Sequence, residues 1–274
     1  MSIWSAIFLG LIQGLTEFLP ISSSGHLSIL NDLFGLTPPE EGHMFFDVLL
    51  HFGTLSSIAI VYWKDIVEMF YEVLGIVNIG PRAGQRKERY PAARLFLMIV
   101  FATLPLVLIL PIKDELETLF YNSIFIGVAL ILTGCLLYVA DKMIPGKKTE
   151  ESMTVYDALI IGLCQCVATI PGLSRSGTTI STGLLCGVKR ESMAQFSFLM
   201  VLVPILGETF LDLVGGEMAA STVGALPLLL GFISAFVSGL FACRVMIALV
   251  RTAQLKWFGL YCALVGIAVL IWLA

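Results

Sequence analysis

Six long apolar segments constrain the fold of this chain more than any other feature of its sequence. A helix that crosses a bilayer needs about 20 predominantly apolar residues, because its backbone groups find no water in the hydrocarbon. Segments of that kind occupy residues 43–63, 92–111, 120–140, 192–214, 225–247 and 255–273. Hydrophobic residues make up 58% of the 274 residues and charged residues 13%. We therefore expect an all-α integral membrane protein with six transmembrane helices.

Three other apolar segments are not expected to cross the membrane. Residues 3–36 are interrupted by Pro20, and residues 155–190 by Pro171, each with a cluster of serine and glycine. Proline disfavours helix at the residue before it, so each segment should break into two short helices. This pattern predicts two re-entrant helical hairpins buried among the spanning helices. Residues 65–77 mix acidic and apolar side chains and predict an amphipathic helix lying on the surface.

The two hairpin segments repeat each other at a constant offset in the sequence. The matching pairs are Ala6/Ala158, Gly10/Gly162, Gln13/Gln165, Ser22/Ser174, Ser24/Ser176 and Gly25/Gly177. Each hairpin is followed by three spans, and because three is odd, the second unit should enter the membrane from the opposite face. We expect one membrane domain, 1–274, made of repeats 1–140 and 155–274 with inverted topology. The two hairpin tips should then meet near the middle of the membrane.

The distribution of basic residues orients these predicted spans. Fourteen of the sixteen lysines and arginines fall on one predicted face, among them those of the loop 82–89, whereas the opposite loops hold Glu40, Glu41 and Glu217. By the positive-inside rule the basic face is cytoplasmic and both termini lie outside. The net charge of −4 comes from scattered residues, so no nucleic-acid partner is expected.

The first hairpin tip, Gln13 to His26, sets ionisable and hydroxyl groups within apolar sequence. A carboxylate at the bilayer centre costs about 2.5–3.5 kcal/mol, so Glu17 should face protein, water or a ligand. Gln13 lies one helical turn before Glu17 and shares its face. The hydroxyls and free N–H groups that follow suit phosphate, although a serine-rich cap on an ordinary helix would look similar. The candidates in this tip are Gln13, Glu17, Ser22, Ser23, Ser24, Gly25 and His26.

The second tip places a guanidinium in an otherwise uncharged hairpin. Arg175 suits an oxyanion because its planar fork gives two parallel hydrogen bonds to phosphate, while a structural ion pair with Glu17 is the alternative. The candidates in this tip are Ser174, Arg175, Ser176, Gly177, Thr178 and Thr179. Asp47 and His51 share a helical face on the first span, where they would either support the site or form ordinary core hydrogen bonds.

Both motifs resemble those of the undecaprenyl-diphosphatases of the bacitracin-resistance type, bacterial membrane enzymes that recycle the cell-wall lipid carrier. The family's (Glu/Gln)-x-x-x-Glu element is similar to Gln13–Glu17 and continues as Pro-x-Ser-Ser-x-Gly-His through His26. Its second motif, Pro-Gly-x-Ser-Arg-Ser-x-x-Thr, resembles Pro171–Thr179 at every fixed position. Many members carry a second glutamate where this chain has Gln13, which weakens any mechanism that needs two carboxylates there.

The resemblance implies hydrolysis of undecaprenyl diphosphate in the bacterial plasma membrane, at a site reached from the outer face, with a divalent cation such as Mg²⁺ or Ca²⁺. Glu17 would bind the metal or act as base, and Arg175 would neutralise charge on the diphosphate. Ser23 or His26 would attack phosphorus, or His26 would activate a water. The diphosphate contacts would come from Gln13, Ser22, Ser24, Gly25, Ser174, Ser176, Gly177, Thr178 and Thr179.

The expected partners are a polyprenyl diphosphate lipid and the surrounding membrane lipids, and whether the chain forms a homo-oligomer is left open. The alternative function is a transporter or flippase of a polyprenyl phosphate or another anion, because inverted repeats with re-entrant hairpins also occur in transporters.

Overall fold

The computed structural model describes residues 1–35, 43–79, 90–119, 122–143, 146–215, 223–252 and 254–273, and these residues are mostly helical. In those ranges there are no β-strands, only an isolated bridge between Lys148 and Val188. The loop 82–89 and residues Glu40, Glu41 and Glu217, on which part of the predicted orientation rests, lie outside them. The helices are α1 (Ile3–Phe18), α2 (Ser23–Phe34), α3 (His43–Val61), α4 (Trp63–Ile76), α5 (Pro91–Thr103), η2 (Leu104–Leu108), η3 (Leu110–Ile112), α6 (Lys113–Thr118), α7 (Ser123–Asp141), α8 (Val155–Val167), α9 (Arg175–Leu185), α10 (Arg190–Met200), α11 (Leu202–Gly215), α12 (Ala225–Thr252) and α13 (Leu255–Leu273).

Within the described ranges, four helical segments are long and apolar enough to cross a membrane: Pro91–Ile112, Ser123–Asp141, Ala225–Leu249 and Leu255–Trp272. The α3–α4 pair, bent by 77°, would make a fifth. The predicted span 192–214 is divided between α10 and α11, with Pro204 in the first turn of α11, where a missing N–H is tolerated. The prediction of an all-α membrane protein is confirmed, and the arrangement of six spans with two hairpins stays a prediction.

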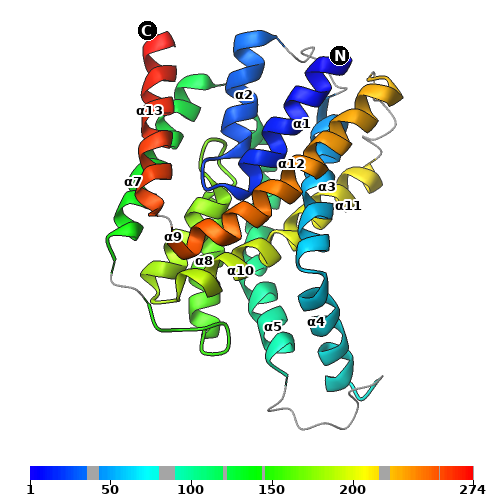
Figure 1. Cartoon of the computed structure of the whole chain (residues 1–274), viewed down its shortest axis with the longest axis vertical. Helices are drawn as coiled ribbons and strands as arrows, with labels where there is room; N and C mark the ends of the chain where they lie inside the picture. The colour runs from blue at the N-terminus through cyan, green and yellow to red at the C-terminus, as the bar shows by residue number, and fades with distance from the viewer. Residues whose placement is uncertain are drawn as a thin grey trace.

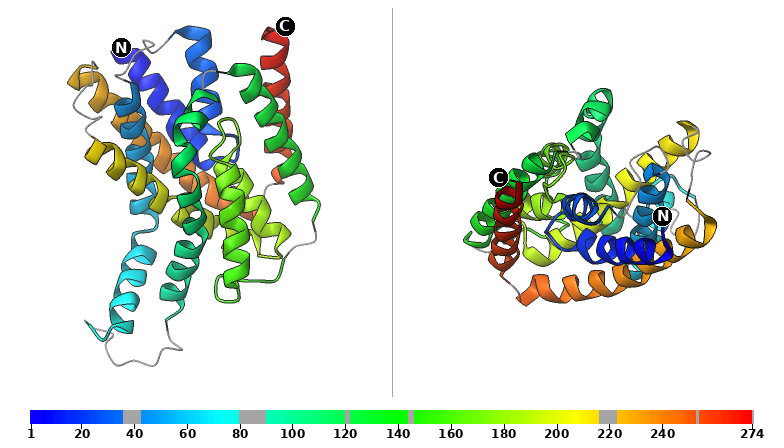
Figure 2. Two further views of the ribbon diagram at one scale, coloured as in Figure 1. Left: turned by 180° about the vertical axis from the view of Figure 1, so that it is seen from behind. Right: turned by 90° about the horizontal axis from the view of Figure 1, so that it is seen from above.

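Both interrupted segments form two helices joined by a short turn, as the sequence predicts. The pairs are α1 with α2 and α8 with α9, and they lie near the centre of the helix assembly (Figures 1 and 2). The two second helices begin in the same way. The N–H of Gly25 donates to the Ser22 hydroxyl at 3.3 Å, and the N–H of Gly177 donates to the Ser174 hydroxyl at 3.1 Å. The repeated Ser and Gly residues are therefore matching N-caps, which satisfy backbone groups at each helix start.

A repeated glycine permits a matching close contact in each half. A Cβ added at Gly10 would lie 2.3 Å from the carbonyl oxygen of Gly231 in α12, and one added at Gly162 would lie 2.3 Å from that of Ala102 in α5. Small residues allow helices to approach closely where apolar burial alone provides little driving force. The first helix of each hairpin thus packs on the second long helix of the other half, α1 on α12 and α8 on α5, while α7 packs on α13.

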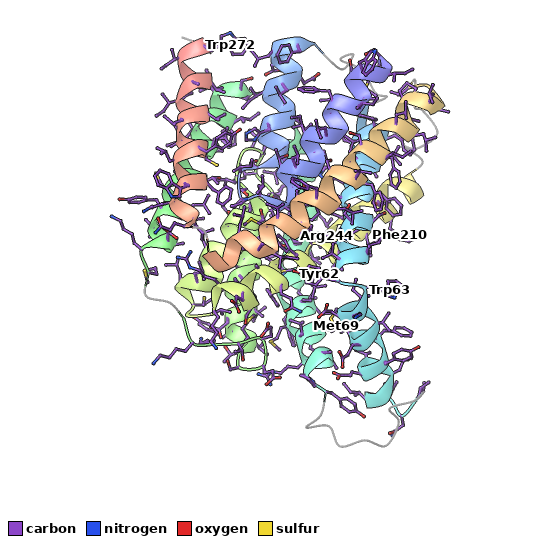
Figure 3. The ribbon with its side chains drawn as sticks, viewed as in Figure 1. Tyr62, Trp63, Met69, Phe210, Arg244 and Trp272 are labelled. Atoms are coloured by element: carbon purple, nitrogen blue, oxygen red, sulfur yellow. The ribbon has the colours of Figure 1, made fainter. Side chains whose placement is uncertain are left out.

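Both chain termini lie at the same end of the molecule, on opposite sides of it, and the far ends of α4 and α5 form the other end (Figures 1 and 2). Tyr62 and Trp63 mark the bend between α3 and α4 (Figure 3). The helix predicted at 65–77 is present, but two of its three acidic residues, Asp65 and Glu72, accept hydrogen bonds from neighbouring helices, while Glu68 is exposed. Glu72 is buried and accepts the N–H of Ala93 at 2.8 Å, while Phe70 on the same helix is exposed. A carboxylate is favourable there because the first N–H groups of α5 have no partner within that helix.

Candidate active site

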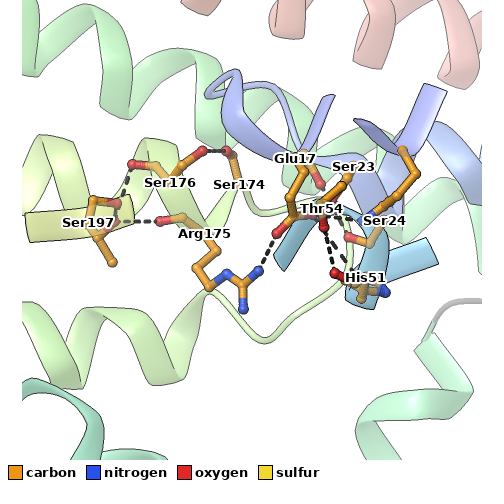
Figure 4. Close-up of polar contacts among 12 residues, drawn as sticks. Glu17, Ser23, Ser24, His51, Thr54, Ser174, Arg175, Ser176 and Ser197 are labelled. Atoms are coloured by element: carbon orange, nitrogen blue, oxygen red, sulfur yellow. Dashed lines mark hydrogen bonds and ion pairs between the residues drawn. The ribbon is translucent and has the colours of Figure 1, made fainter. Parts of the chain in front are cut away.

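The two hairpin tips contact each other, as the repeat predicts. A Cβ added at Gly25 would lie 3.2 Å from the Cα of Gly172, so the two turns approach closely. The Ser176 hydroxyl donates to the carbonyl oxygen of Leu19 across the same contact at 3.2 Å. Polar groups from residues 150 positions or more apart in the chain are thereby brought into one centre (Figure 4).

Glu17 lies at the middle of this centre. Its Oε1 forms an ion pair with Arg175 Nη2. Its Oε2 accepts hydrogen bonds from Ser23 Oγ at 2.7 Å and from Gln13 Nε2 at 3.1 Å. His51 Nε2 lies 4.0 Å from the same oxygen. The Glu17 side chain is only 5% exposed, so this buried carboxylate is stabilised by one cation and two hydrogen-bond donors.

The second tip is fixed to α7 by Thr133. The N–H of Ser174 donates to the Thr133 hydroxyl at 3.1 Å, and that hydroxyl donates to the carbonyl oxygen of Gly172 at 3.2 Å. Gly172 adopts φ +88°, and a Cβ there would lie 2.8 Å from the Ala129 side chain. Thr133 is a contributor that the sequence did not reveal, because a lone threonine in an apolar span has no distinguishing pattern.

A pocket of about 470 Å³ opens beside the centre. Seven of the predicted residues line it: Glu17, Ser22, Ser23, Ser24, Ser174, Arg175 and Ser176. Most of the remaining lining is apolar and comes from η2, η3, α6 and the start of α11. The pocket therefore combines a polar end, made by the hairpin tips, with an apolar wall.

His26 does not line this pocket, although the sequence marked it as a candidate nucleophile or base. Its Nδ1 lies 2.7 Å from the carbonyl oxygen of Ser22, and its Nε2 lies 2.8 Å from the hydroxyl of Tyr261 in α13. The two rings also stack, with centroids 5.5 Å apart. Both ring nitrogens are thus engaged on the side of the hairpin that packs against α13.

The other predicted residues lie behind the lining. Gln13 contacts Glu17 from a buried position, and Gly25 and Gly177 act in the helix caps. Thr179 donates to the carbonyl oxygen of Arg175 at 2.9 Å and contacts the Ser197 hydroxyl at 2.7 Å. Thr178 is buried, and its hydroxyl has no hydrogen-bond partner among the described residues.

His51 and Gln165 are two further residues of the lining. The sequence leaves His51 open between a supporting group and a core residue, and in the structure its Nδ1 lies 2.9 Å from the carbonyl oxygen of Asp47. The sequence identifies Gln165 only as the repeat partner of Gln13. Its pairing with Gln13 in the repeat was the available signal.

The polar end fits a divalent cation only when the substrate supplies further ligands. The described residues contain no group of three or more His, Cys, Asp or Glu side chains that could hold a metal ion. Glu17 is the one carboxylate in the pocket lining. Magnesium is commonly bound by one or two carboxylates together with substrate phosphates, and hydroxyls add the oxygen ligands that both Mg²⁺ and Ca²⁺ prefer. The donor set therefore suits a shared ion rather than an all-protein cage.

Helical hairpin tips that join a buried carboxylate, serine hydroxyls and an arginine in one pocket define this chain as a membrane protein with a polar centre suited to phosphate chemistry. The family model described as bacitracin resistance protein BacA matches residues 6–268, and the chain belongs to that family.

Curated relatives extend over nearly the whole chain. A protein named undecaprenyl-diphosphatase from Christiangramia forsetii is 43% identical over 99% of this chain and 98% of its own length. Proteins with the same name from Bacteroides fragilis and Carboxydothermus hydrogenoformans are 42% and 39% identical, each over 99% of this chain and 98% and 97% of their own lengths. The family resemblance drawn from the two motifs is therefore confirmed.

Proposed function

We propose that this chain hydrolyses undecaprenyl diphosphate to undecaprenyl phosphate and inorganic phosphate, and so recycles the cell-wall lipid carrier and confers resistance to bacitracin. The proposal rests mainly on the two contacts that the Glu17 carboxylate makes. One carboxylate oxygen accepts the Ser23 hydroxyl, and the other is paired with Arg175. The name shared by the relatives supports the same activity.

The diphosphate binds at the polar end of the pocket. The first turns of α2 and α9 both contribute to the lining, and helix N-termini favour anions through their free N–H groups and the helix dipole. Arg175 adds a planar fork that matches two phosphate oxygens. Two helix starts and a guanidinium around one pocket supply positive potential for a substrate with several negative charges.

Ser23 is the nucleophile in this proposal. Its Oγ attacks the distal phosphorus, the bond from that phosphorus to the bridging oxygen breaks, and undecaprenyl phosphate leaves. The proton of the hydroxyl passes to Glu17, which already accepts it in a 2.7 Å hydrogen bond. Water then splits the phosphoserine, releasing inorganic phosphate and returning the proton to Ser23. An acceptor within hydrogen-bond reach of a hydroxyl is the arrangement that activates a weak nucleophile.

His26 is the less favourable nucleophile. Both of its ring nitrogens already lie within hydrogen-bond distance of protein groups, namely the Ser22 carbonyl and the Tyr261 hydroxyl. Attack on phosphorus would require the ring to leave both contacts. We assign His26 to positioning, because its contact with the Ser22 carbonyl fixes the turn that carries Ser23.

A divalent cation would be held by Glu17 together with oxygens of the bound diphosphate. When bound, such an ion would neutralise negative charge that develops on the transferred phosphoryl group and the leaving phosphate. Arg175 serves the same electrostatic purpose from the second tip.

The prenyl chain lies against the apolar wall formed by η2, η3 and α11 and continues into the surrounding lipid. By the positive-inside rule, we place the entrance for the diphosphate on the outer face of the bacterial plasma membrane. A transporter of the same lipid would need anion contacts but no hydroxyl donating to a carboxylate, so the Ser23–Glu17 contact favours hydrolysis.

The proposal is tested by measuring phosphate release from a C55 isoprenyl diphosphate by the purified protein in detergent. We expect multiple turnovers by the wild type and none by Glu17→Gln, which keeps the shape of the side chain but removes its charge. Absence of phosphate release by the wild type, combined with movement of the intact lipid across proteoliposomes, would support the transporter instead.

A further inference from the structure

The side-chain amide of Gln165 in α8 has no role in the proposed reaction as described so far. Its side chain is 1% exposed and lines the pocket, and neither its Nε2 nor its Oε1 has a hydrogen-bond partner among the described residues. A primary amide offers two donors and one acceptor oxygen. Leaving such a group buried and unpaired is unfavourable, so an unpaired amide in a pocket wall requires an explanation.

The repeat shows which partner is missing. In the first hairpin, Gln13 donates to Glu17 one helical turn later, at 3.1 Å. The corresponding residue after Gln165 is Thr169, whose hydroxyl donates to the carbonyl oxygen of Cys166 at 2.7 Å. The glutamine is thus repeated and its acceptor is not. Gln165, unlike Gln13, belongs to the pocket lining.

We propose that the Gln165 amide donates a hydrogen bond to an oxygen of the bound diphosphate. This inference rests on the proposed function, since it takes the pocket to be the diphosphate site. Arg175 and the serine hydroxyls of the two tips are among the other lining side chains that can donate to an anion, and they lie at the starts of α2 and α9. Gln165 would add a neutral donor from a third helix, α8, and so fix the orientation of the headgroup. It is a positioning residue and takes no part in proton transfer.

The test compares three variants of the full-length purified protein: Gln165→Leu, Gln165→Glu and the control Gln254→Glu. Gln254 is exposed in the link between α12 and α13, so Gln254→Glu introduces the same negative charge at a position outside the pocket lining. The measured quantities are kcat and KM for a C55 isoprenyl diphosphate, the inhibition constant of inorganic pyrophosphate, and the unfolding temperature with and without pyrophosphate.

Loss of one hydrogen bond to a charged group should raise KM and the pyrophosphate inhibition constant about tenfold in Gln165→Leu, with a smaller change in kcat. The ligand-free unfolding temperature should stay the same or rise, because leucine removes an unpaired polar group. Gln165→Glu should weaken binding further, since a carboxylate replaces the donor and repels the anion. Gln254→Glu should resemble the wild type in every measurement.

Two results would overturn the inference. Wild-type affinity for pyrophosphate in Gln165→Glu would exclude donation to the anion. A fall in the ligand-free unfolding temperature of Gln165→Leu that parallels its loss of binding would assign the amide a structural role. Stabilisation by pyrophosphate needs no turnover, so a wild type that binds pyrophosphate without hydrolysing the lipid would count against the proposed function alone.

Discussion

Glu17 and Arg175 form an ion pair that joins the two hairpin tips, although the residues are 158 positions apart in the chain. Glu17 is 5% exposed and Arg175 is 27% exposed. Both residues line the pocket, and the guanidinium side chain is the more exposed of the two. In the ligand-free protein the two charges neutralise each other. A bound diphosphate would replace Glu17 as the partner of Arg175.

We expect Arg175→Lys to lower kcat/KM about 10- to 100-fold. Lysine keeps a positive charge near Glu17, but it cannot make the two parallel hydrogen bonds that arginine offers to phosphate, and bonds to charged groups contribute about 1.5–3 kcal/mol. Phosphate release from the C55 substrate measures the effect, and the unfolding temperature serves as the control for folding. Near-normal turnover by a stable Arg175→Lys protein would refute this role.

Ser23→Ala should abolish turnover, whereas His26→Ala should leave slow activity. Removal of the nucleophile eliminates the covalent pathway, whereas His26→Ala leaves Ser23 and Glu17 in place and removes only a contact that fixes the turn carrying Ser23. Tyr261→Phe, which deletes the hydroxyl next to His26 Nε2, should have a milder effect in the same direction.

Rapid quenching decides between the two nucleophiles. Acid should trap a phosphoserine in the wild type that is missing from Ser23→Ala. An acid-labile adduct that disappears in His26→Ala would end the serine proposal, and no adduct at all would favour direct attack by water.

Removal of divalent cations with a chelator should stop phosphate release, and adding back Mg²⁺ or Ca²⁺ should restore it. Glu17 is the one carboxylate in the described pocket lining, so the ion would depend on the substrate for further oxygen ligands. Binding of a non-hydrolysable diphosphonate, measured by thermal shift, should therefore be stronger with the cation than without it. Full activity in excess chelator would remove the cation from the proposal.

Gly10→Ala and Gly162→Ala should each destabilise the protein by about 1–3 kcal/mol, because the new methyl group would overlap a backbone carbonyl oxygen 2.3 Å away. Gly207→Ala is the matched control. Gly207 is also helical, and nothing lies within 4 Å of the Cβ that the change would add. Thermal unfolding in one detergent compares the three, and equal unfolding temperatures would contradict the close-contact explanation.

Single cysteines in a cysteine-free variant test the topology. Those at positions 82–89 should react with an impermeant reagent only from the cytoplasm, and those at 38–42 only from outside. Reaction of both loops from the same side of intact cells would reject the inverted repeat.

Much of the fold was predictable because long apolar segments, proline breaks and Ser-Gly caps act locally. Contacts between distant segments were not. The acidic residues of α4 indicated a water-facing side, yet Asp65 accepts a hydrogen bond from Gln195 in α10 at 3.0 Å, and Glu72 caps α5. A sequence pattern shows which residues share a helix face, but it does not identify the element against which that face packs.

The candidate site was likewise only partly predictable from the sequence. Glu17 and Arg175 stood out because charges within apolar sequence are rare and costly. The placement of His26 could not be read from its motif, since it depends on Tyr261, which lies 235 positions away. The sequence shows that Thr169 stands where Glu17 follows Gln13, but the place of Gln165 in the pocket wall could not be predicted from it.

Ser23 and Arg175 occupy the same place on the two tips, as the first helical residue after the capping serines Ser22 and Ser174. Both contact Glu17, one at each carboxylate oxygen. A symmetric pair of identical subunits would present either two hydroxyls or two guanidinium groups at these positions, and neither combination joins an attacking group to an anion clamp. Because both tips belong to one chain here, the residues at these two positions can differ. The scaffold keeps its symmetry in the caps and glycine contacts, while the chemistry depends on positions at which the copies have diverged, Ser23 and Arg175 among them.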